Sequence, residues 1–261
     1  MRHRQRPQNT GSGLFVGLML LYLFAPLALV VLFSFATSPR SAFPPTALTL
    51  DWYANAFADS RFVPALRNSV IAAAASAVVA GVLGTAFALG LVGLRTRTRS
   101  MASSMTLLPA VLPGLLIGIA LTVFFLGIGV RLSLTTAVAG HVLIGLPFVI
   151  LTMNARMEGF DQSVLEAARD LGANPVGAFR DITFPLIRPS VIGSMMLVMA
   201  ISLDEFIVTF FTVGSDQTLP VLIWAMLRRG IDPAVNAIAT VIILGTVGLT
   251  VVAGKWARIR L

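Results

Sequence analysis

The sequence has no cysteine, only two histidines and few charged residues. The absence of cysteine excludes disulfide bonds, thiol catalysis and cysteine-bound metals. The two histidines, His3 and His141, do not form a His-Glu-x-x-His zinc motif, and we predict no metal site. Charged residues make up 11% of the 261 residues, whereas soluble domains carry about 25%. The composition therefore excludes an ordinary soluble protein.

The motifs of several large enzyme classes are also missing. A phosphate-binding loop needs Gly-x-x-x-x-Gly-Lys followed by Ser or Thr. The only Gly-Lys pair, Gly254-Lys255, is followed by Trp256, and Leu249 stands where the first glycine should be. No serine lies in a Gly-x-Ser-x-Gly motif. We therefore predict that the chain is not an enzyme, hydrolyses no ATP and binds no cofactor of its own.

What the sequence does have is long apolar blocks. Hydrophobic residues form 57% of the chain, and the mean hydropathy of +0.90 excludes disorder. A helix that crosses a bilayer needs about 20 mostly apolar residues. Six stretches meet this requirement: Leu14–Ala36, Ser69–Leu94, Met105–Val130, Leu134–Met153, Ser190–Val213 and Ala234–Gly254.

These blocks predict an all-α polytopic membrane protein with six transmembrane helices, organised as one transmembrane domain over residues 1–261. They lack the strict alternation of a membrane β-barrel. The first block follows Arg2, Arg4 and Arg6, as a secretory signal would. Its apolar run is longer than the roughly 7 to 15 residues of a signal peptide, so we expect an uncleaved first span.

The basic residues predict the topology. Six spans place both termini on one side of the membrane, and that side carries 13 of the 19 Lys and Arg residues, against 6 on the other. Basic residues are enriched in cytoplasmic loops. Both termini are therefore predicted to be cytoplasmic, and the net charge of +8 is interpreted as a topology signal and not as a nucleic-acid site.

This topology assigns the loops. Residues Thr37–Asn68 lie outside and are expected to include a short surface helix. The basic triplet Arg95, Arg97 and Arg99 is expected to form a tight cytoplasmic turn. The longest cytoplasmic connection is Arg156–Arg188, which holds nine charged residues. Residues Ser215–Pro233 lie outside and include an amphipathic piece.

The long cytoplasmic loop has the pattern of two short helices. Ser163 and Glu166 have the spacing of a capping box, and Gly172 is placed to end the first helix. A second helix is expected to begin near Asn174 and Pro175 and to end before Pro185. One interpretation is a solvated connector. Apolar residues between the charges favour a docking element instead: Leu165, Ala168, Leu171, Phe179 and Ile182.

The spacing in this loop resembles a known family. Glu166-Ala167-Ala168, three residues, Gly172, nine residues, Ile182 and then Phe184-Pro185 are similar to the Glu-Ala-Ala loop of binding-protein-dependent ABC importer permeases. The family pattern ends in Leu-Pro, and Phe184 replaces that leucine here. The resemblance implies a coupling helix that seats in an ATPase subunit. It implies this set of ATPase-coupling residues: Glu166, Ala167, Ala168, Leu171, Gly172, Ile182 and Pro185.

Segments of the C-terminal half resemble the C-type permease of spermidine and putrescine importers. They are Ser202–Phe206, Thr218–Pro220, Met226–Arg228 and Pro233–Thr240. The resemblance implies the type I ABC importer permease fold in a bacterial inner membrane, half of a translocation pathway and polyamine transport. Similar permeases move aminoethylphosphonate, opines, amino acid derivatives or iron, so these substrates remain alternatives.

The resemblance also implies partners. It implies a second, related permease subunit in a heterodimer, two ATPase subunits that use ATP and Mg, and a periplasmic or lipid-anchored substrate-binding protein. The chain itself is then a non-catalytic transport subunit embedded in the lipid bilayer. A proton-driven secondary transporter that uses His141 and Asp204 is the rival from another class, although only one half of the chain has an acidic break.

Two adjacent acids interrupt the fifth predicted span. Asp204 lies 14 residues after Ser190, or about 21 Å along a helix, in the outer half of the bilayer. Charges at this depth face a cavity or find a partner. One interpretation places Asp204, Glu205, Phe206 and Trp224 in the substrate pathway, where acids attract a cationic polyamine. The alternative is that the two acids are structural or mark a helix break.

Trp224 and His141 each allow a structural interpretation. Trp224 fits an interfacial anchor, or else an outer gate or a contact with the substrate-delivery protein. His141, in the fourth span, is expected to be a packed or hydrogen-bonded residue of the helix bundle rather than a proton relay. The small-residue pairs Gly13 with Gly17 and Gly114 with Gly118 fit close helix packing.

Overall fold

The computed structural model describes residues 10–37, 43–45, 47–159, 163–228 and 234–258. Within these ranges the regular structure is helical, with one isolated β-bridge between Ala36 and Leu48. The all-α prediction is confirmed. The chain divides into two compact units, residues 1–59 with 225–241 and residues 60–224 with 242–261, which are described separately.

The first unit contains α1 (Thr10–Phe33) and α2 (Asp51–Ala58). The segment after α1 is tied to α2, because the Trp52 indole donates to the Ala36 carbonyl at 2.7 Å and Ser34 Oγ lies 2.7 Å from the Tyr53 hydroxyl. The short helix expected in the outer loop is therefore present as α2. Most large apolar side chains of α1 are exposed, as befits a helix that meets lipid or another membrane helix.

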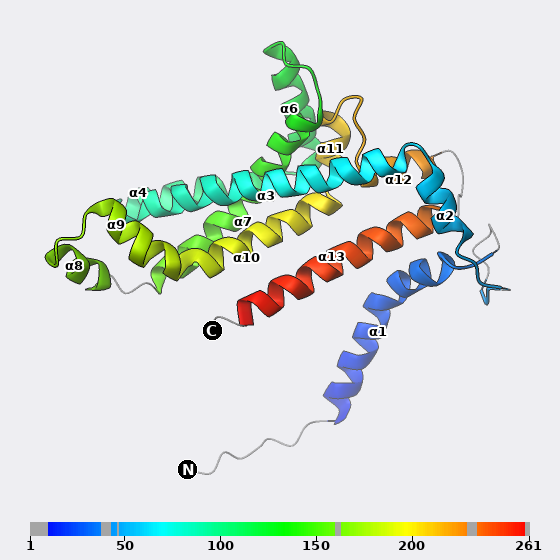
Figure 1. The fold of residues 1–261 in the computed structure, drawn as a ribbon, viewed down its shortest axis with the longest axis horizontal. Coiled ribbons are helices and arrows are strands. Elements are labelled where there is room, and N and C mark those ends of the chain that lie inside the picture. The colour runs from blue at the N-terminus through cyan, green and yellow to red at the C-terminus, as the bar shows by residue number, and fades with distance from the viewer. Residues whose placement is uncertain (1–9, 38–42, 46, 160–162, 229–233, 259–261) are drawn as a thin grey trace. The chain divides into compact units, whose positions relative to one another are not determined.

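The core of the second unit is made by three long helices that pack side by side (Figure 1). They are α3 (Phe62–Val92), α7 (Leu134–Glu158) and α10 (Phe184–Asp204). Glycines allow the close approach, since a methyl group on Gly84 would strike Val149 and one on Gly145 would strike Val198. Small residues at helix contacts are the usual means of packing helices in a membrane, where apolar burial gives little driving force.

The third predicted span, Met105–Val130, is wrong as a continuous helix. The structure has α4 (Thr96–Thr106), α5 (Leu108–Val111) and α6 (Gly114–Gly127), with a 98° bend between residues 97–111 and α6. The break lies at Leu112 and Pro113, which are both extended. Proline has no amide N–H and disfavours a helical residue before it, so the helix stops at this point.

The basic triplet is also different from the prediction. Arg95 precedes α4, whereas Arg97 and Arg99 lie within it, so the tight turn is shorter than expected and the helix begins at Thr96. The predicted glycine pair on α6 does pack closely, since Gly114 faces Ile207 and Gly118 faces Phe211. Among the described residues, no atom lies within 4 Å of the place that a methyl group on Gly13 or Gly17 would take.

The fifth predicted span, Ser190–Val213, begins earlier and ends earlier than expected. Helix α10 starts at Phe184 and ends at Asp204, and a separate helix α11 covers Ile207–Thr212. The chain continues through α12 (Leu219–Leu227) and α13 (Ala234–Arg258). In the described part, five helices are long and apolar enough to cross a membrane, and the number rises to six if the bent pair before and after Pro113 counts as one span.

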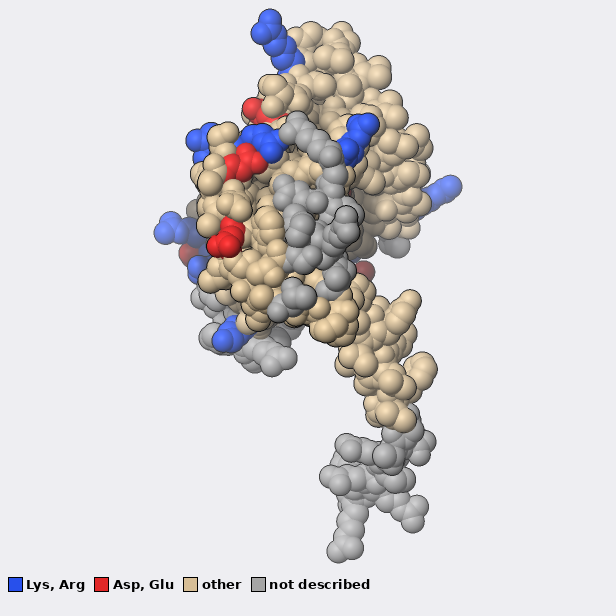
Figure 2. Space-filling model, turned by 90° about the vertical axis from the view of Figure 1, so that its right-hand side faces the viewer, with Lys and Arg blue, Asp and Glu red and all other residues tan. Residues whose placement is uncertain are grey.

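The loops of the second unit sort to two ends as the topology predicts. The start of α4 and the segment after α7 lie at one end, and α6 and α11 lie at the other (Figure 1). The side that faces the cytoplasm stays a prediction. Figure 2 shows a surface on which Lys, Arg, Asp and Glu side chains are few and dispersed among uncharged residues, as expected for a protein embedded in lipid.

Gly214, in the loop between α11 and α12, gives a prediction about stability. Its φ of +66° is left-handed, and a methyl group there would overlap the Leu132 carbonyl oxygen. Gly214→Ala is therefore expected to destabilise the protein by about 1–3 kcal/mol. Thermal unfolding in detergent measures this effect. The control is Gly193→Ala on α10, where the methyl group meets open space; equal melting temperatures for the two variants would contradict the prediction.

Candidate coupling loop and substrate pathway

The first site is the loop that carries the Glu-Ala-Ala sequence. Helix α8 covers Ser163–Asp170, with Glu166 in its first turn. The helix ends in a glycine cap, because Gly172 has a φ of +85° and the Ala173 amide donates to the Ala168 carbonyl at 3.0 Å. This six-residue hydrogen bond is the Schellman pattern, which satisfies a carbonyl at the helix end. The predicted helix and its stop at Gly172 are confirmed.

The second half of this loop corrects the prediction. Asn174 caps α9 (Pro175–Ala178), since its side-chain oxygen accepts from the Gly177 amide at 2.7 Å. The helix does not end before Pro185. It passes through a π-helical turn, Phe179–Thr183, directly into α10, so that residues 175–204 form one helical segment.

The π-helical turn explains how Pro185 fits into this segment. A proline inside an α-helix lacks its amide and clashes with the carbonyl four residues earlier. The wider turn moves the local hydrogen bonds to a spacing of five residues, as in the bond from the Phe184 amide to the Phe179 carbonyl. The side chain of Thr183 likewise donates to the Ala178 carbonyl at 3.4 Å. The part of the loop that follows Asn174 and the transmembrane helix are thus one continuous helix, whereas α8 is a separate element.

The exposed side of the loop is both acidic and apolar. Glu166 and Ala167 are exposed, whereas Ala168 is buried. Leu171, at the end of α8, is 89% exposed, and Val176 on α9 is also exposed. Ile182 is half-buried in the π-helical turn, and Pro185 is exposed at the start of α10. An exposed leucine beside a rigid glycine cap is a suitable contact for another protein.

The loop is braced against the neighbouring span. Arg156, near the end of α7, donates from Nε and Nη2 to the Leu186 carbonyl at 3.2 and 2.9 Å. Its guanidinium group therefore joins the end of α7 to the first turn of α10. This brace fixes the base of the loop while α8 and Leu171 remain accessible at its tip.

The second site is the break after Asp204. Helix α10 ends at Asp204, whose side chain is exposed and has no hydrogen-bond or ion-pair partner within the described part of the chain. Glu205 behaves differently, because its carboxylate accepts from the Val208 amide at 2.9 Å at the start of α11. Adjacent residues with the same charge therefore have separate surroundings: Asp204 is free to meet a ligand, and Glu205 caps a helix.

Aromatic rings surround the start of α11. The Phe206 ring lies 5.7 Å from the rings of both Phe210 and Trp224, and Phe210 lies 4.7 Å from Trp224. Trp224 comes from α12, so the cluster joins two elements. Phe206 and Trp224 are predicted from the sequence, but Phe210 is not, although its position four residues after Phe206 places it on the same helical face.

His141, on α7, forms hydrogen bonds to both helices at the break, α10 and α11. It is 3% exposed. Nδ1 lies 2.5 Å from Ser202 Oγ on α10, and Nε2 lies 2.6 Å from Thr209 Oγ1 on α11. The expectation of a packed, hydrogen-bonded histidine is met by this geometry. Its two particular partners could not be read from the sequence, since they lie 61 and 68 residues away.

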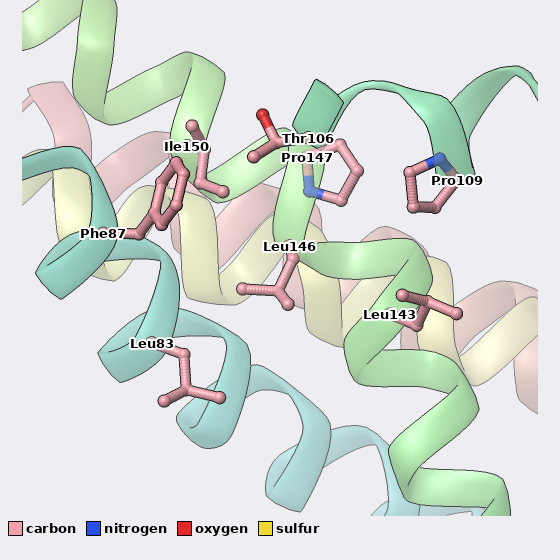
Figure 3. Close-up of a pocket in the computed structure, with 8 residues that line it drawn as sticks. All are labelled: Leu83, Phe87, Thr106, Pro109, Leu143, Leu146, Pro147 and Ile150. Atoms are coloured by element: carbon pink, nitrogen blue, oxygen red, sulfur yellow. The ribbon is translucent and has the colours of Figure 1, made fainter. Parts of the chain in front are cut away.

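A cavity of about 380 Å³ lies elsewhere in the second unit, between α3, α5 and α7 (Figure 3). Its lining is apolar except for Thr106, whose hydroxyl already donates to the Ser103 carbonyl at 2.7 Å. The lining contains no carboxylate or other charged group. A polar or charged solute would lose its hydration there without compensation, so this cavity is not the candidate substrate site.

Comparison with known proteins identifies the family of this chain. Residues 80–259 match the family described as the binding-protein-dependent transport system inner membrane component. The spermidine/putrescine permease protein PotC of Haemophilus influenzae is 32% identical over 231 residues, which cover 88% of this chain and 90% of PotC. The putrescine permease protein PotI of Escherichia coli K12 is 32% identical over 236 residues, with 87% and 83% coverage.

The fold has a solved counterpart. A chain of a bacterial ABC transporter that imports the acidic polysaccharide alginate superposes with a TM-score of 0.75, and 98% of each chain is covered. Its sequence is only 16% identical, so the likeness concerns the fold alone.

Long apolar helices joined by a loop with a Glu-Ala-Ala sequence are typical of a membrane transport subunit. The chain belongs to the inner membrane components of binding-protein-dependent transport systems, the permeases of ABC importers. It is a multi-pass inner-membrane protein, and the resemblance described for residues 166–185 is confirmed.

Proposed function

We propose that this permease forms half of a polyamine pathway, with spermidine or putrescine as the substrate. The observation that carries the proposal is the exposed carboxylate of Asp204 at the helix break, which has no partner among the described residues. It lies two residues from the aromatic cluster of Phe206, Phe210 and Trp224. A carboxylate attracts an ammonium group, and the faces of aromatic rings attract it further. PotC and PotI, which carry polyamine names, support the same substrate class.

The charge at this site separates polyamines from the anionic alternatives. Aminoethylphosphonate carries an ammonium group that the Asp204 carboxylate would attract, but also a phosphonate group that it would repel, so the net interaction is weaker than with a polyamine. Opines and amino acid derivatives carry both positive and negative groups, so the Asp204 carboxylate would attract only the positive part of the molecule. Iron would need several oxygen or nitrogen ligands, whereas the Glu205 carboxylate is engaged by the Val208 amide. A linear polycation fits an exposed acid two residues from an aromatic cluster best.

The coupling part of the proposal rests on α8. Glu166, Ala167 and Leu171 would seat in a separate ATPase subunit, which supplies ATP hydrolysis with Mg. Support comes from the exposure of these residues and from the unbroken helical path of residues 175–204, which leads from the loop to Asp204. ABC importer permeases work with a second permease, ATPases and a substrate-binding protein; for this chain we propose a heterodimer, two ATPases and a periplasmic or lipid-anchored binding protein.

The membership of a binding-protein-dependent family argues against the proton-driven secondary transporter. The bonds of His141 argue in the same direction, because both ring nitrogens are engaged by hydroxyl groups. A proton relay would need an acidic or aqueous neighbour at this ring. Both observations favour the ATP-driven importer.

The substrate is tested on the partner binding protein, because specificity in such systems is expected to begin there. We expect titration calorimetry to show that the binding protein takes up spermidine or putrescine and does not bind aminoethylphosphonate. The same binding protein, loaded with its ligand, should then stimulate ATP hydrolysis by the assembled complex. Tight binding of an anion with no response to polyamines would overturn the substrate assignment.

A further inference from the structure

We propose that His141 is a positioning residue that holds the two sides of the helix break together and thereby fixes the position of Asp204. The break separates α10 from α11, and the helical hydrogen-bond ladder does not continue across it. His141 belongs to a third helix, α7, and contacts both sides. The part of this inference that concerns transport rests on the proposed function, whereas the structural part does not.

The two contacts lie close to the break on either side. Ser202 lies two residues before Asp204 on α10, and Thr209 lies two residues after the first residue of α11. Ser202, Thr209 and His141 are all buried. The hydrogen bonds that Glu205 makes at the break are local, to the Val208 amide and the Thr209 hydroxyl, whereas Phe206 and Val208 make packing contacts with Trp224 of α12 and Gly140 of α7. The imidazole therefore adds to this packing a hydrogen-bonded connection from α7 to both α10 and α11.

The hydrogen bonds determine which ring nitrogen carries the proton. The Thr209 hydroxyl donates to the Glu205 carbonyl at 2.7 Å, so its oxygen accepts from His141. Nε2 is therefore protonated, and in the neutral ring Nδ1 accepts from the Ser202 hydroxyl. Both ring nitrogens and both hydroxyl groups then have a hydrogen-bond partner. A buried network that is fully satisfied fixes geometry, since any displacement leaves a group without a partner.

The position of this network suggests what it controls. Residues 175–204 form one helical segment that begins beside α8 and ends at Asp204. At 1.5 Å per residue its length is about 45 Å, so a displacement of the coupling loop would be transmitted to the break. At that point His141 ties the moving end of α10 to α7 and α11. Without these hydrogen bonds, α10 could move while Asp204 takes no fixed position relative to α7 and α11.

The absence of cysteine in the chain makes a direct test possible. Spin labels are attached through Leu186→Cys on α10 and Ile207→Cys on α11, both exposed positions. The distance between them is measured by pulsed electron resonance in the assembled complex in lipid nanodiscs. We expect a narrow distribution for the otherwise unchanged chain and a broadened or shifted distribution for His141→Leu.

Further variants separate positioning from general packing. The pair Ser202→Ala with Thr209→Val should reproduce the broadening, and adding His141→Leu to this pair should change nothing more. Thr209→Ser keeps the hydroxyl and should keep the narrow distribution. Ser76→Ala is the matched control, because it removes another buried hydrogen bond, from α3 to the Val138 carbonyl of α7, which involves neither α10 nor α11. It should leave the distribution narrow.

The functional measurement is the number of substrate molecules moved per ATP hydrolysed. In His141→Leu we expect this number to fall by about threefold or more while the complex assembles and hydrolyses ATP. If His141→Leu fails to assemble, Ser202→Ala with Thr209→Val decides the matter by the distance measurement. A narrow distribution in these variants, or equal broadening in Ser76→Ala, would overturn the proposal. A different substrate would leave the distance results intact and would count only against the proposed function.

Discussion

Replacing Asp204 by asparagine is expected to lower polyamine uptake by about tenfold or more, while the complex still assembles. The side chain keeps its size and loses its charge. Asp204 has no hydrogen-bond or ion-pair partner in the described part of the chain, so the folded structure does not depend on the charge. The substrate does depend on it, because two unit charges about 4 Å apart attract by about 4 kcal/mol at an effective dielectric constant near 20. Uptake of radiolabelled spermidine measures the effect.

Glu205→Gln provides the matched control. It removes the neighbouring charge, but its side-chain oxygen can still accept from the Val208 amide and cap α11. We expect uptake to fall less than in Asp204→Asn. Glu205→Ala removes the cap as well and should cost about 1 kcal/mol of stability. Unchanged transport in both Asp204→Asn and Glu205→Gln would show that these acids do not serve the pathway.

The second large effect is expected at the coupling loop. Glu166→Lys should abolish uptake, because it reverses an exposed charge on the surface proposed to meet the ATPase. It also places a cation in the first turn of α8, where the helix dipole disfavours it by about 0.3–1 kcal/mol. Gly172→Pro should have a similar effect, since the φ of +85° at this position is closed to proline. Copurification of the ATPase with the permease measures the loss.

A charge reversal outside the coupling set serves as the control for this experiment. Glu158 is exposed at the end of α7, and Glu158→Lys makes the same change of charge. It should retain ATPase binding and uptake. An intact complex with full transport in both Glu166→Lys and Gly172→Pro would remove the coupling role from α8.

The sequence predicts the coupling loop well because its signals are local. Ser163, Glu166 and Gly172 mark a helix start and stop within ten residues, and the structure has a helix there that ends in a left-handed glycine. The positions of the long spans follow from composition in the same way. In both cases the physical cause, capping or apolar length, acts over a single element.

The errors come from prolines whose effect depends on context. Pro113 breaks the third span into a bent pair, whereas Pro185 is accommodated by a π-helical turn and does not end its helix. Both prolines lack the same amide group. Pro147 and Pro189 lie inside α7 and α10 without any break, so the outcome at a proline depends on the packed helix and not on the short sequence around it.

The identities of the site residues can be predicted from the sequence, but their contacts cannot. Asp204 and Glu205 are visible in the sequence as charges in an apolar block, but their different surroundings depend on where α10 ends. His141 is visible as a lone histidine, yet its link to Ser202 and Thr209 joins residues that are distant in the chain. Contacts of this kind depend on helix packing, which periodicity and composition do not specify.

The central claim is tested most directly by uptake into proteoliposomes. The permease is reconstituted with its partner permease, ATPases and binding protein, and ATP-driven uptake of spermidine is compared with that of aminoethylphosphonate. We predict uptake of spermidine that requires ATP and the binding protein and that falls in Asp204→Asn, with no uptake of the phosphonate. ATP-driven uptake of the phosphonate, with spermidine neither transported nor competing, would contradict this claim.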